Sequence, residues 1–144
     1  MDAQDKTKRR FASEFTPRFS DFDMQGIMSS RCYLDYLVEA RIDQMARCYE
    51  LPLAHYAERN QTWVFSAVAL DFLSPVLFGA KIVVETEVTK IEGAAATVDF
   101  AFRHPTKDRV FARGCATYHL IDLATKRPID VPAKDVEVFL SRQA

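Results

Sequence analysis

The chain has 144 residues, of which 49% are hydrophobic and 27% charged, and its formal net charge is -1. This composition is typical of one globular domain, excludes a disordered chain and disfavours nucleic acid as the main partner. The apolar runs are shorter than the roughly 20 residues of a membrane-spanning helix, and the polar tail 1–10 lacks the apolar core of a signal peptide. We therefore expect a single cytoplasmic domain over residues 1–144, with no membrane association.

An edge strand and a long helix are the first predicted elements. Residues 11–19 alternate imperfectly between apolar and polar, and a proline near the end of this run confines such a strand to a sheet edge. A turn-like stretch, 20–30, leads to the best helical pattern, 31–49, with Ser29 or Ser30 as the N-cap. Apolar residues at three- and four-residue spacings predict the buried face of this helix: Leu34, Leu37, Val38, Ile42, Met45 and Tyr49.

Strand patterns dominate the rest of the chain, after a short second helix predicted over 51–59. Residues 62–73 are almost continuously apolar, which predicts a strand buried on both faces. A C-terminal extension, 128–144, is predicted to hold a short helix. Alternating strands joined by short hairpin connections occupy the region between them: 81–91, 95–103 and 110–121. One amphipathic helix followed by an antiparallel meander is an α+β arrangement, in which the sheet must wrap the helix to bury it.

The three cysteines predict no metal site. Cys32, Cys48 and Cys115 lack the close paired spacing of zinc ligands, so we interpret them as small buried apolar groups. A nucleophile pair of Cys115 and His119 is excluded, because four residues along a strand span about 13 Å. The three histidines fall on different elements, and none is predicted to be catalytic.

The segment from Asp21 to Arg41 carries the most specific motif. It opens with a D-x-D-x-x-G turn at Asp21, Asp23 and Gly26 and continues into the predicted helix with a matching set of residues: Tyr33, Leu34, Tyr36, Glu39, Ala40 and Arg41. This segment resembles the opening of the 4-hydroxybenzoyl-CoA thioesterase-like hot-dog family, with a weaker likeness in residues 71–79. The resemblance implies a hot-dog fold, an antiparallel sheet wrapped around one long central helix, and hydrolysis of an acyl-CoA thioester to the free acid and coenzyme A.

The resemblance also implies that Asp23, beside Gly26, is the catalytic carboxylate, either as nucleophile or as general base for water. Unpaired backbone N–H groups at the start of the helix, near Ser30, are expected to stabilise the oxyanion. The alternative is that Asp23 only caps turn amides, the role we favour for Asp21. For Ser30, substrate contact and helix capping both stay open. Four residues are predicted to line the substrate, the first three also enclosing the carboxylate: Phe22, Ile27, Met28 and Tyr33.

Other charged and aromatic residues have less specific interpretations. For Glu39 and Arg41, which match the family helix, we favour a structural role, as an internal ion pair of a buried helix, over a functional one. Trp63 and Phe65, with Phe22, indicate an apolar acyl pocket. A basic cluster on one hairpin is predicted to meet the phosphates of coenzyme A, against the alternative of an ordinary solvated hairpin tip: Arg103, His104, Lys107 and Arg109.

Three functions stay open. Thioester hydrolysis without a metal or other cofactor is preferred, on acyl-CoA or on an acyl carrier protein. A hydratase or dehydratase of acyl thioesters on the same fold normally uses a histidine, and segment 21–41 has none. A non-catalytic acyl-CoA binding or sensor protein is the other alternative, against which the presence of Asp23 argues. The resemblance further implies a homodimer or tetramer, because a monomer would leave a long sheet edge unpaired.

Overall fold

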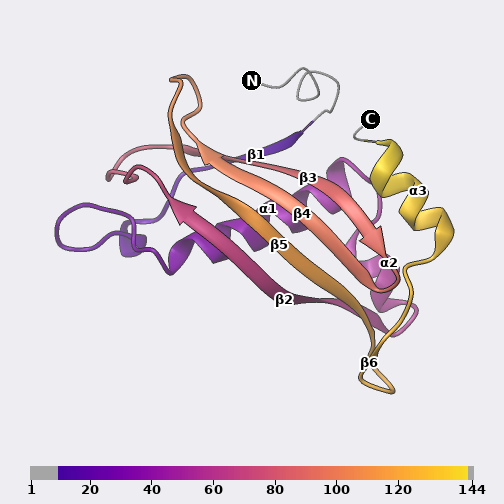
Figure 1. Ribbon diagram of the computed structural model, residues 1–144. Helices are drawn as coiled ribbons and strands as arrows, with labels where there is room; N and C mark the ends of the chain where they lie inside the picture. Colours follow the sequence, from indigo (N-terminus) through magenta and orange to yellow (C-terminus); the bar gives the residue numbers. More distant parts are fainter. Residues whose placement is uncertain (1–9, 143–144) are drawn as a thin grey trace.

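The computed structural model describes residues 10–142, and its elements follow the predicted order (Figure 1). Most of the predicted tail 1–10 therefore lies outside the described residues. No helix within residues 10–142 is long and apolar enough to cross a membrane. The bounds agree with the predicted segments to within a few residues, and only two short elements, η2 and β6, were not predicted. The elements are β1 (Phe11–Phe15), η2 (Phe19–Asp21), α1 (Cys32–Arg47), α2 (Leu53–Ala57), β2 (Gln61–Phe72), β3 (Ile82–Glu92), β4 (Ala95–Arg103), β5 (Val110–Asp122), β6 (Arg127–Pro128) and α3 (Ala133–Ser141).

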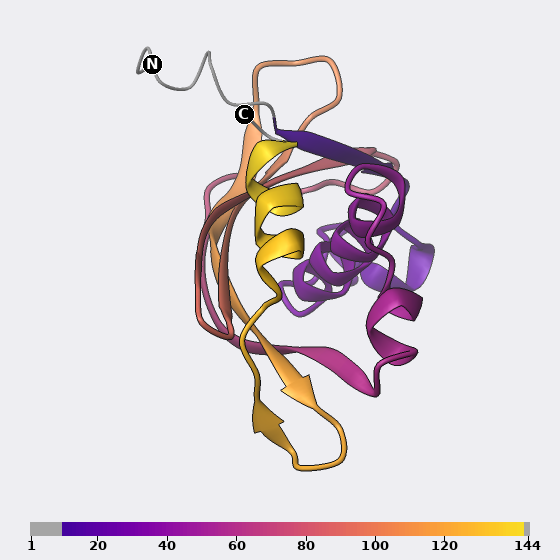
Figure 2. The same cartoon turned by 90° about the vertical axis from the view of Figure 1, so that its right-hand side faces the viewer.

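A single antiparallel sheet curls around α1, as Figure 2 shows, with strand order β1-β3-β4-β5-β2 and β6 paired to β5. The strands β3, β4 and β5 form the predicted meander. The short β1 occupies one edge of the sheet, also as predicted, and β2 occupies the other after crossing to pair with β5. The predicted α+β arrangement, a sheet wrapped around one long helix, is confirmed.

The environment of β2 was predicted wrongly. Its apolar run predicts burial on both faces, but β2 is an edge strand and most of its residues are exposed. Val64 is 43% exposed, Val68 38% and Phe72 53%. The apolar run therefore marks a surface that one copy of the chain leaves open.

The buried face of α1 also differs from the predicted one. Leu34, Val38 and Ile42 are exposed, although Leu37 and Met45 are buried as predicted. The helix is rotated because it buries polar side chains that find partners on the sheet. Its buried residues are Cys32, Tyr33, Tyr36, Leu37, Ala40, Arg41, Gln44 and Met45.

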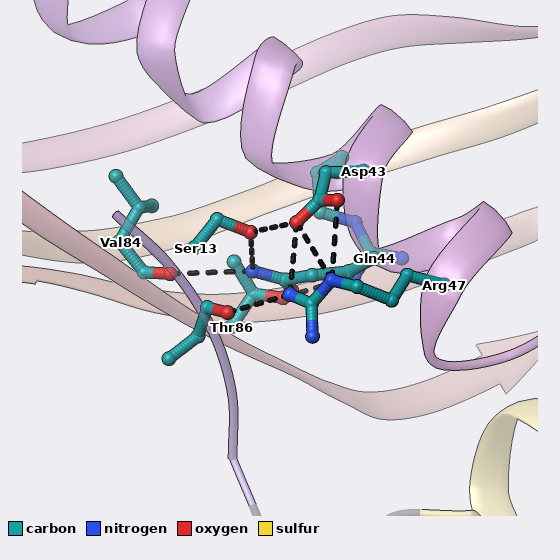
Figure 3. A network of polar contacts seen from close by, with 8 residues as sticks. Ser13, Asp43, Gln44, Arg47, Val84 and Thr86 are labelled. Atoms are coloured by element: carbon teal, nitrogen blue, oxygen red, sulfur yellow. Dashed lines mark hydrogen bonds and ion pairs between the residues drawn. The ribbon is translucent and has the colours of Figure 1, made fainter. Parts of the chain in front are cut away.

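A polar network joins α1 to β1 and β3 (Figure 3). Gln44 donates from Nε2 to Ser13 Oγ (3.0 Å) and to a β3 carbonyl oxygen (3.2 Å), and its Oε1 accepts from the Thr86 hydroxyl. Ser13 Oγ donates to Asp43 (2.5 Å), which pairs with Arg47 (2.8 Å). Because Ser13, Gln44 and Thr86 each have a hydrogen-bond partner across the helix–sheet boundary, this network fixes the rotation of α1 against the two strands.

Two buried clusters fill the space between α1 and the sheet. The first lies along the start of the helix and includes Leu37, Phe100 and Phe102. The second lies where α1 meets α2 and α3 and includes Tyr56 and Phe139. All three cysteines were predicted to be buried. Cys32 is buried, whereas Cys48 and Cys115 are half-buried.

Candidate active site

The loop between η2 and α1 positions Asp23 at its tip. The Gly26 N–H donates to the Asp23 carbonyl (3.0 Å), and Gly26 has a φ of +76°, a conformation that residues with a Cβ rarely adopt. The Asp23 N–H donates to the Ile27 carbonyl (2.9 Å) across the loop. The Phe78 N–H donates to the Gly26 carbonyl (2.9 Å), which ties the loop to the segment after β2. The turn therefore holds Asp23 in a defined place.

The Asp23 carboxylate is oriented by its own turn and faces solvent. Oδ1 accepts hydrogen bonds from the Gln25 N–H (2.9 Å) and the Ile27 N–H (3.1 Å), whereas Oδ2 accepts none from residues 10–142. The side chain is exposed, so the predicted enclosure by Phe22, Ile27 and Met28 is wrong for a single chain. The carboxylate is fixed through one oxygen and presents the other.

Asp23 lies in a shallow depression with apolar walls. The Phe78 ring makes edge-to-face contacts with Phe22 (centroids 5.3 Å apart) and Phe19 (5.5 Å). Phe19 is 82% exposed and Met24 is fully exposed, and a patch of exposed apolar side chains commonly marks a binding surface. Of the predicted site residues, the structure brings together Phe22, Asp23 and Gly26. The sequence analysis missed Phe19, Met24 and Phe78 as residues of this depression. For Met24 a signal was available, because it is a large apolar residue in a segment predicted to be a turn.

Three predicted substrate residues lie elsewhere. Met28 and Tyr33 are core residues, each 3% exposed. Tyr33 packs against Phe72 and Phe102, both with ring centroids 5.1 Å away, and burial raises the pKa of its hydroxyl. Ile27 is half-buried and pairs through its backbone with the segment after β2. These three residues do not line the depression around Asp23.

The start of α1 presents unpaired backbone donors. The helix begins at Cys32 with Arg31 as N-cap, so the predicted N-cap at Ser29 or Ser30 is wrong. The reason is an extra turn before the regular helix, in which the Cys32 N–H donates to the Ser29 carbonyl (3.0 Å). The N–H groups of Ser30 and Arg31 donate to no acceptor within the described part of the chain. Such donors lie at the positive end of the helix dipole.

Asp21 anchors the loop to α1, in agreement with its predicted structural role. It is buried, and its Oδ2 accepts hydrogen bonds from the Arg18 N–H (2.9 Å) and the Tyr36 hydroxyl. Its carbonyl accepts from the Ser29 N–H (2.8 Å). Burial opposes the charge of Asp21, but the hydrogen bonds from Tyr36 and Arg18 outweigh burial and hold the pKa of this carboxyl below its usual value.

We expect Tyr36→Phe to lower the free energy of unfolding by about 1.5 to 3 kcal/mol at pH 7, because it removes a hydrogen bond to a charged group. Since the pKa of Asp21 is depressed in the folded state, its stabilisation is present above the unfolded value of about 3.9 and is lost as the pH falls through the folded value. The difference between wild type and variant should therefore shrink below about pH 4. Urea unfolding of both proteins at pH 7 and pH 3 measures this difference in stability.

Tyr33→Phe is the matched control for this prediction, because burial and a backbone contact, and no carboxylate, determine the pKa of the Tyr33 hydroxyl. Its effect on stability should not change between the two pH values. An effect of Tyr36→Phe that is equally large at pH 7 and pH 3 would show that Asp21 is not the partner that matters.

The predicted phosphate-binding arginines differ in their availability. Arg103 donates from Nε to Glu85 and from Nη1 to the His104 carbonyl (3.2 Å). Arg109 and Lys107 are exposed on the connection between β4 and β5. The ion pair with Glu85 therefore occupies Arg103, whereas Lys107 and Arg109 remain exposed.

The predicted ion pair of Glu39 with Arg41 is wrong. Glu39 is exposed, whereas Arg41 is buried and donates to the Thr86 hydroxyl (2.9 Å). The glutamate and the arginine lie on different faces of α1, because residues two apart on a helix do not face each other. Trp63 and Phe65 line a second cavity, between α1 and the sheet, that shares no residue with the depression around Asp23.

A curled antiparallel sheet around one long helix is the architecture of the hot-dog fold, and comparison with solved structures agrees. The chain is similar to a 1,4-dihydroxy-2-naphthoyl-CoA thioesterase from Synechocystis (TM-score 0.81, 17% identity, covering 91% of this chain and 96% of that one). It is also similar to a DHNA-CoA thioesterase from Staphylococcus aureus (TM-score 0.82, 16% identity, covering 92% of this chain and 89% of that one). A hypothetical protein from Thermus thermophilus is a further similar structure (TM-score 0.82, 19% identity, covering 92% of this chain and 98% of that one). The predicted hot-dog fold is confirmed.

The family model of the thioesterase-like superfamily matches residues 17–142. The chain belongs to this superfamily, as the motif around Asp23 predicts. A search of the curated proteins found no match.

Proposed function

We propose that the protein hydrolyses an acyl-CoA thioester to the free acid and coenzyme A, with Asp23 as the catalytic carboxylate. The observation that carries this proposal is the Asp23 carboxylate in an apolar depression, fixed through Oδ1 and open at Oδ2. Membership of the thioesterase-like superfamily supports the reaction class. The thioesterases from Synechocystis and Staphylococcus aureus, each with an acyl-CoA substrate in its name, support coenzyme A as the carrier.

In the proposed mechanism, Asp23 acts on one side of the thioester carbonyl and backbone donors act on the other. As general base, Oδ2 takes a proton from the attacking water. As nucleophile, the same oxygen forms a mixed anhydride that water then hydrolyses. In both routes the N–H of Ser30 is the proposed donor to the oxyanion. The sulfur of coenzyme A leaves with the electron pair of the broken C–S bond, and coenzyme A is released as the thiol. Gly26 keeps the turn that aims the carboxylate.

Thiol release from a panel of acyl-CoAs tests this function. Short, medium, long and aromatic acyl groups should give turnover for at least one class, because the walls of the depression are apolar and select for an acyl group of matching shape. Acyl carrier protein thioesters in the same assay compare the two carriers. Saturable binding of acyl-CoAs with no hydrolysis of any of them would instead identify a binding or sensor protein.

We also propose that the protein is a homodimer or a tetramer. The outer edge of β2 pairs with no strand of residues 10–142. Exposed apolar residues follow this edge and the neighbouring face of α1, and a second copy would cover them: Leu34, Val38, Ile42, Val64, Val68 and Phe72. An unpaired edge beside an apolar surface favours pairing with another chain.

Val68→Lys is expected to dissociate this oligomer, because it places a charge in the middle of the exposed β2 surface and removes apolar area. Val110→Lys is the matched control, since Val68 and Val110 are both 38% exposed and Val110 lies at the start of β5. Light scattering of the purified proteins measures the mass. A wild-type monomer, or equal effects of the two substitutions, would contradict the proposed surface.

A further inference from the structure

The cavity between α1 and the sheet is a second candidate binding site. Its volume is about 140 Å³, close to the roughly 150 Å³ that accommodates a benzene ring in a protein core. Its walls are mainly apolar side chains from α1, β2 and α3, including Ile42, Met45, Trp63, Phe65 and Phe139. Two polar side chains interrupt these walls, Arg41 and Tyr118.

Arg41 is a buried cation, and no carboxylate in the described part of the chain is paired with it. It is 6% exposed, and its guanidinium forms no ion pair with any carboxylate among residues 10–142. Nη1 donates to Thr86 Oγ1 (2.9 Å), and the guanidinium carbon lies 5.6 Å from the centre of the Tyr49 ring. Nε is buried and has no acceptor. A buried charge in this situation is costly unless a counter-ion is supplied.

The polar network of Figure 3 does not neutralise Arg41. Thr86 accepts from Arg41 and donates its own hydrogen to Gln44, and the chain of neutral groups continues to Asp43. Asp43 is already paired with Arg47 (2.8 Å). The network therefore holds two guanidinium groups and one carboxylate, which leaves one positive charge at the wall of an apolar cavity.

Tyr118 adds a hydrogen-bond donor to the same cavity. Its hydroxyl is buried and has no hydrogen-bond partner within the described residues. Burial raises the pKa of Tyr118 to about 12, and the nearby charge of Arg41 opposes this rise. The phenol is thus protonated at neutral pH and can donate to an anion that Arg41 attracts.

We propose that this cavity binds a small carboxylic acid with an apolar body, whose carboxylate accepts hydrogen bonds from Arg41 and Tyr118. A guanidinium matches a carboxylate in shape as well as charge, and the apolar walls accommodate a ring or a short hydrocarbon chain. Arg41 lies about 13 Å along α1 from the start of the helix. The site is therefore separate from Asp23, and the binding of a free acid here does not depend on the proposed hydrolysis.

Trp63, the single tryptophan of the sequence, lines the cavity and reports its occupation by fluorescence. Benzoate and hexanoate should give a saturable change at pH 7, and the neutral isosteres benzamide and hexanamide should bind at least tenfold more weakly. Arg41→Met should weaken acid binding at least tenfold. Arg113→Met, at an exposed position on β5, is the matched control and should leave binding unchanged.

Tyr118→Phe keeps the ring and removes one donor, so it should weaken acid binding by a smaller factor, and circular dichroism verifies the fold of each variant. If Arg41→Met does not fold, Tyr118→Phe decides the question. Equal binding of acids and amides, or acid binding that these variants leave unchanged, overturns the proposal.

Two sources supply this chemistry, a free acid or the far end of a dicarboxylic acyl chain bound at Asp23. The second source rests on the proposed function and is tested by hydrolysis of sebacoyl-CoA against decanoyl-CoA, which have chains of equal length and differ in a terminal carboxylate. If sebacoyl-CoA is hydrolysed faster than decanoyl-CoA and Arg41→Met abolishes this preference, the acyl chain is the ligand. If the two are hydrolysed equally fast, a free acid is the ligand. Both outcomes support the site, and an absence of hydrolysis leaves the fluorescence test intact.

Discussion

Asp23→Asn is expected to lower kcat/KM for acyl-CoA hydrolysis by about 100-fold or more, which corresponds to a loss of about 2.7 kcal/mol of transition-state stabilisation. Asparagine has nearly the same shape and keeps an oxygen that can accept from the Gln25 and Ile27 amides, so the turn should be preserved. The amide cannot attack the thioester or take a proton from water. The loss should therefore appear in catalysis and not in stability.

Asp35→Asn is the control for Asp23→Asn. It makes the same chemical change at an exposed position of α1, outside the depression, and should leave the rate within about twofold of wild type. Thiol release and thermal unfolding are measured for all three proteins. If Asp23→Asn retains most of the activity, another group performs the chemistry and Asp23 only caps its turn.

Gly114→Ala is expected to destabilise the fold by about 3 kcal/mol or more, the upper range for overpacking a core. A Cβ at this position would lie 1.9 Å from the carbonyl oxygen of Ala69 and 2.8 Å from the Phe100 ring. The backbone of Ala69 belongs to the neighbouring strand β2, so β2 and β5 would have to move apart. Because the obstacle is mainly backbone, no side-chain rotation relieves it.

Gly79→Ala separates this steric effect from backbone strain. Gly79 has a φ of +91°, but nothing lies within 4 Å of a Cβ built there. Strain alone should cost about 1 kcal/mol. Urea unfolding of both variants gives the comparison, and a Gly114→Ala variant no less stable than Gly79→Ala would mean that β2 and β5 do not approach as closely as described.

The exposed faces of β2 and α1 show where sequence patterns were insufficient. Val68 is apolar but 38% exposed. The periodicity of a strand does not say whether the same chain covers an apolar side chain. The same holds for Leu34 and Ile42 on α1. Arg41 is internal as predicted, but its predicted partner Glu39 is exposed on another face of the helix, because two residues two apart do not face each other.

Local patterns by themselves determined much of this protein. Helical spacing located α1, alternation located the strands, and short connections determined the meander of β3, β4 and β5, because these features depend on neighbours in the chain. The motif around Asp23 indicated the superfamily for the same reason. Only the tertiary structure decided that Phe78 meets Phe22 beside Asp23, and that Arg41 faces a cavity with no carboxylate of residues 10–142 paired to it. Those contacts join residues far apart in the chain, so they depend on how the sheet curls around the helix.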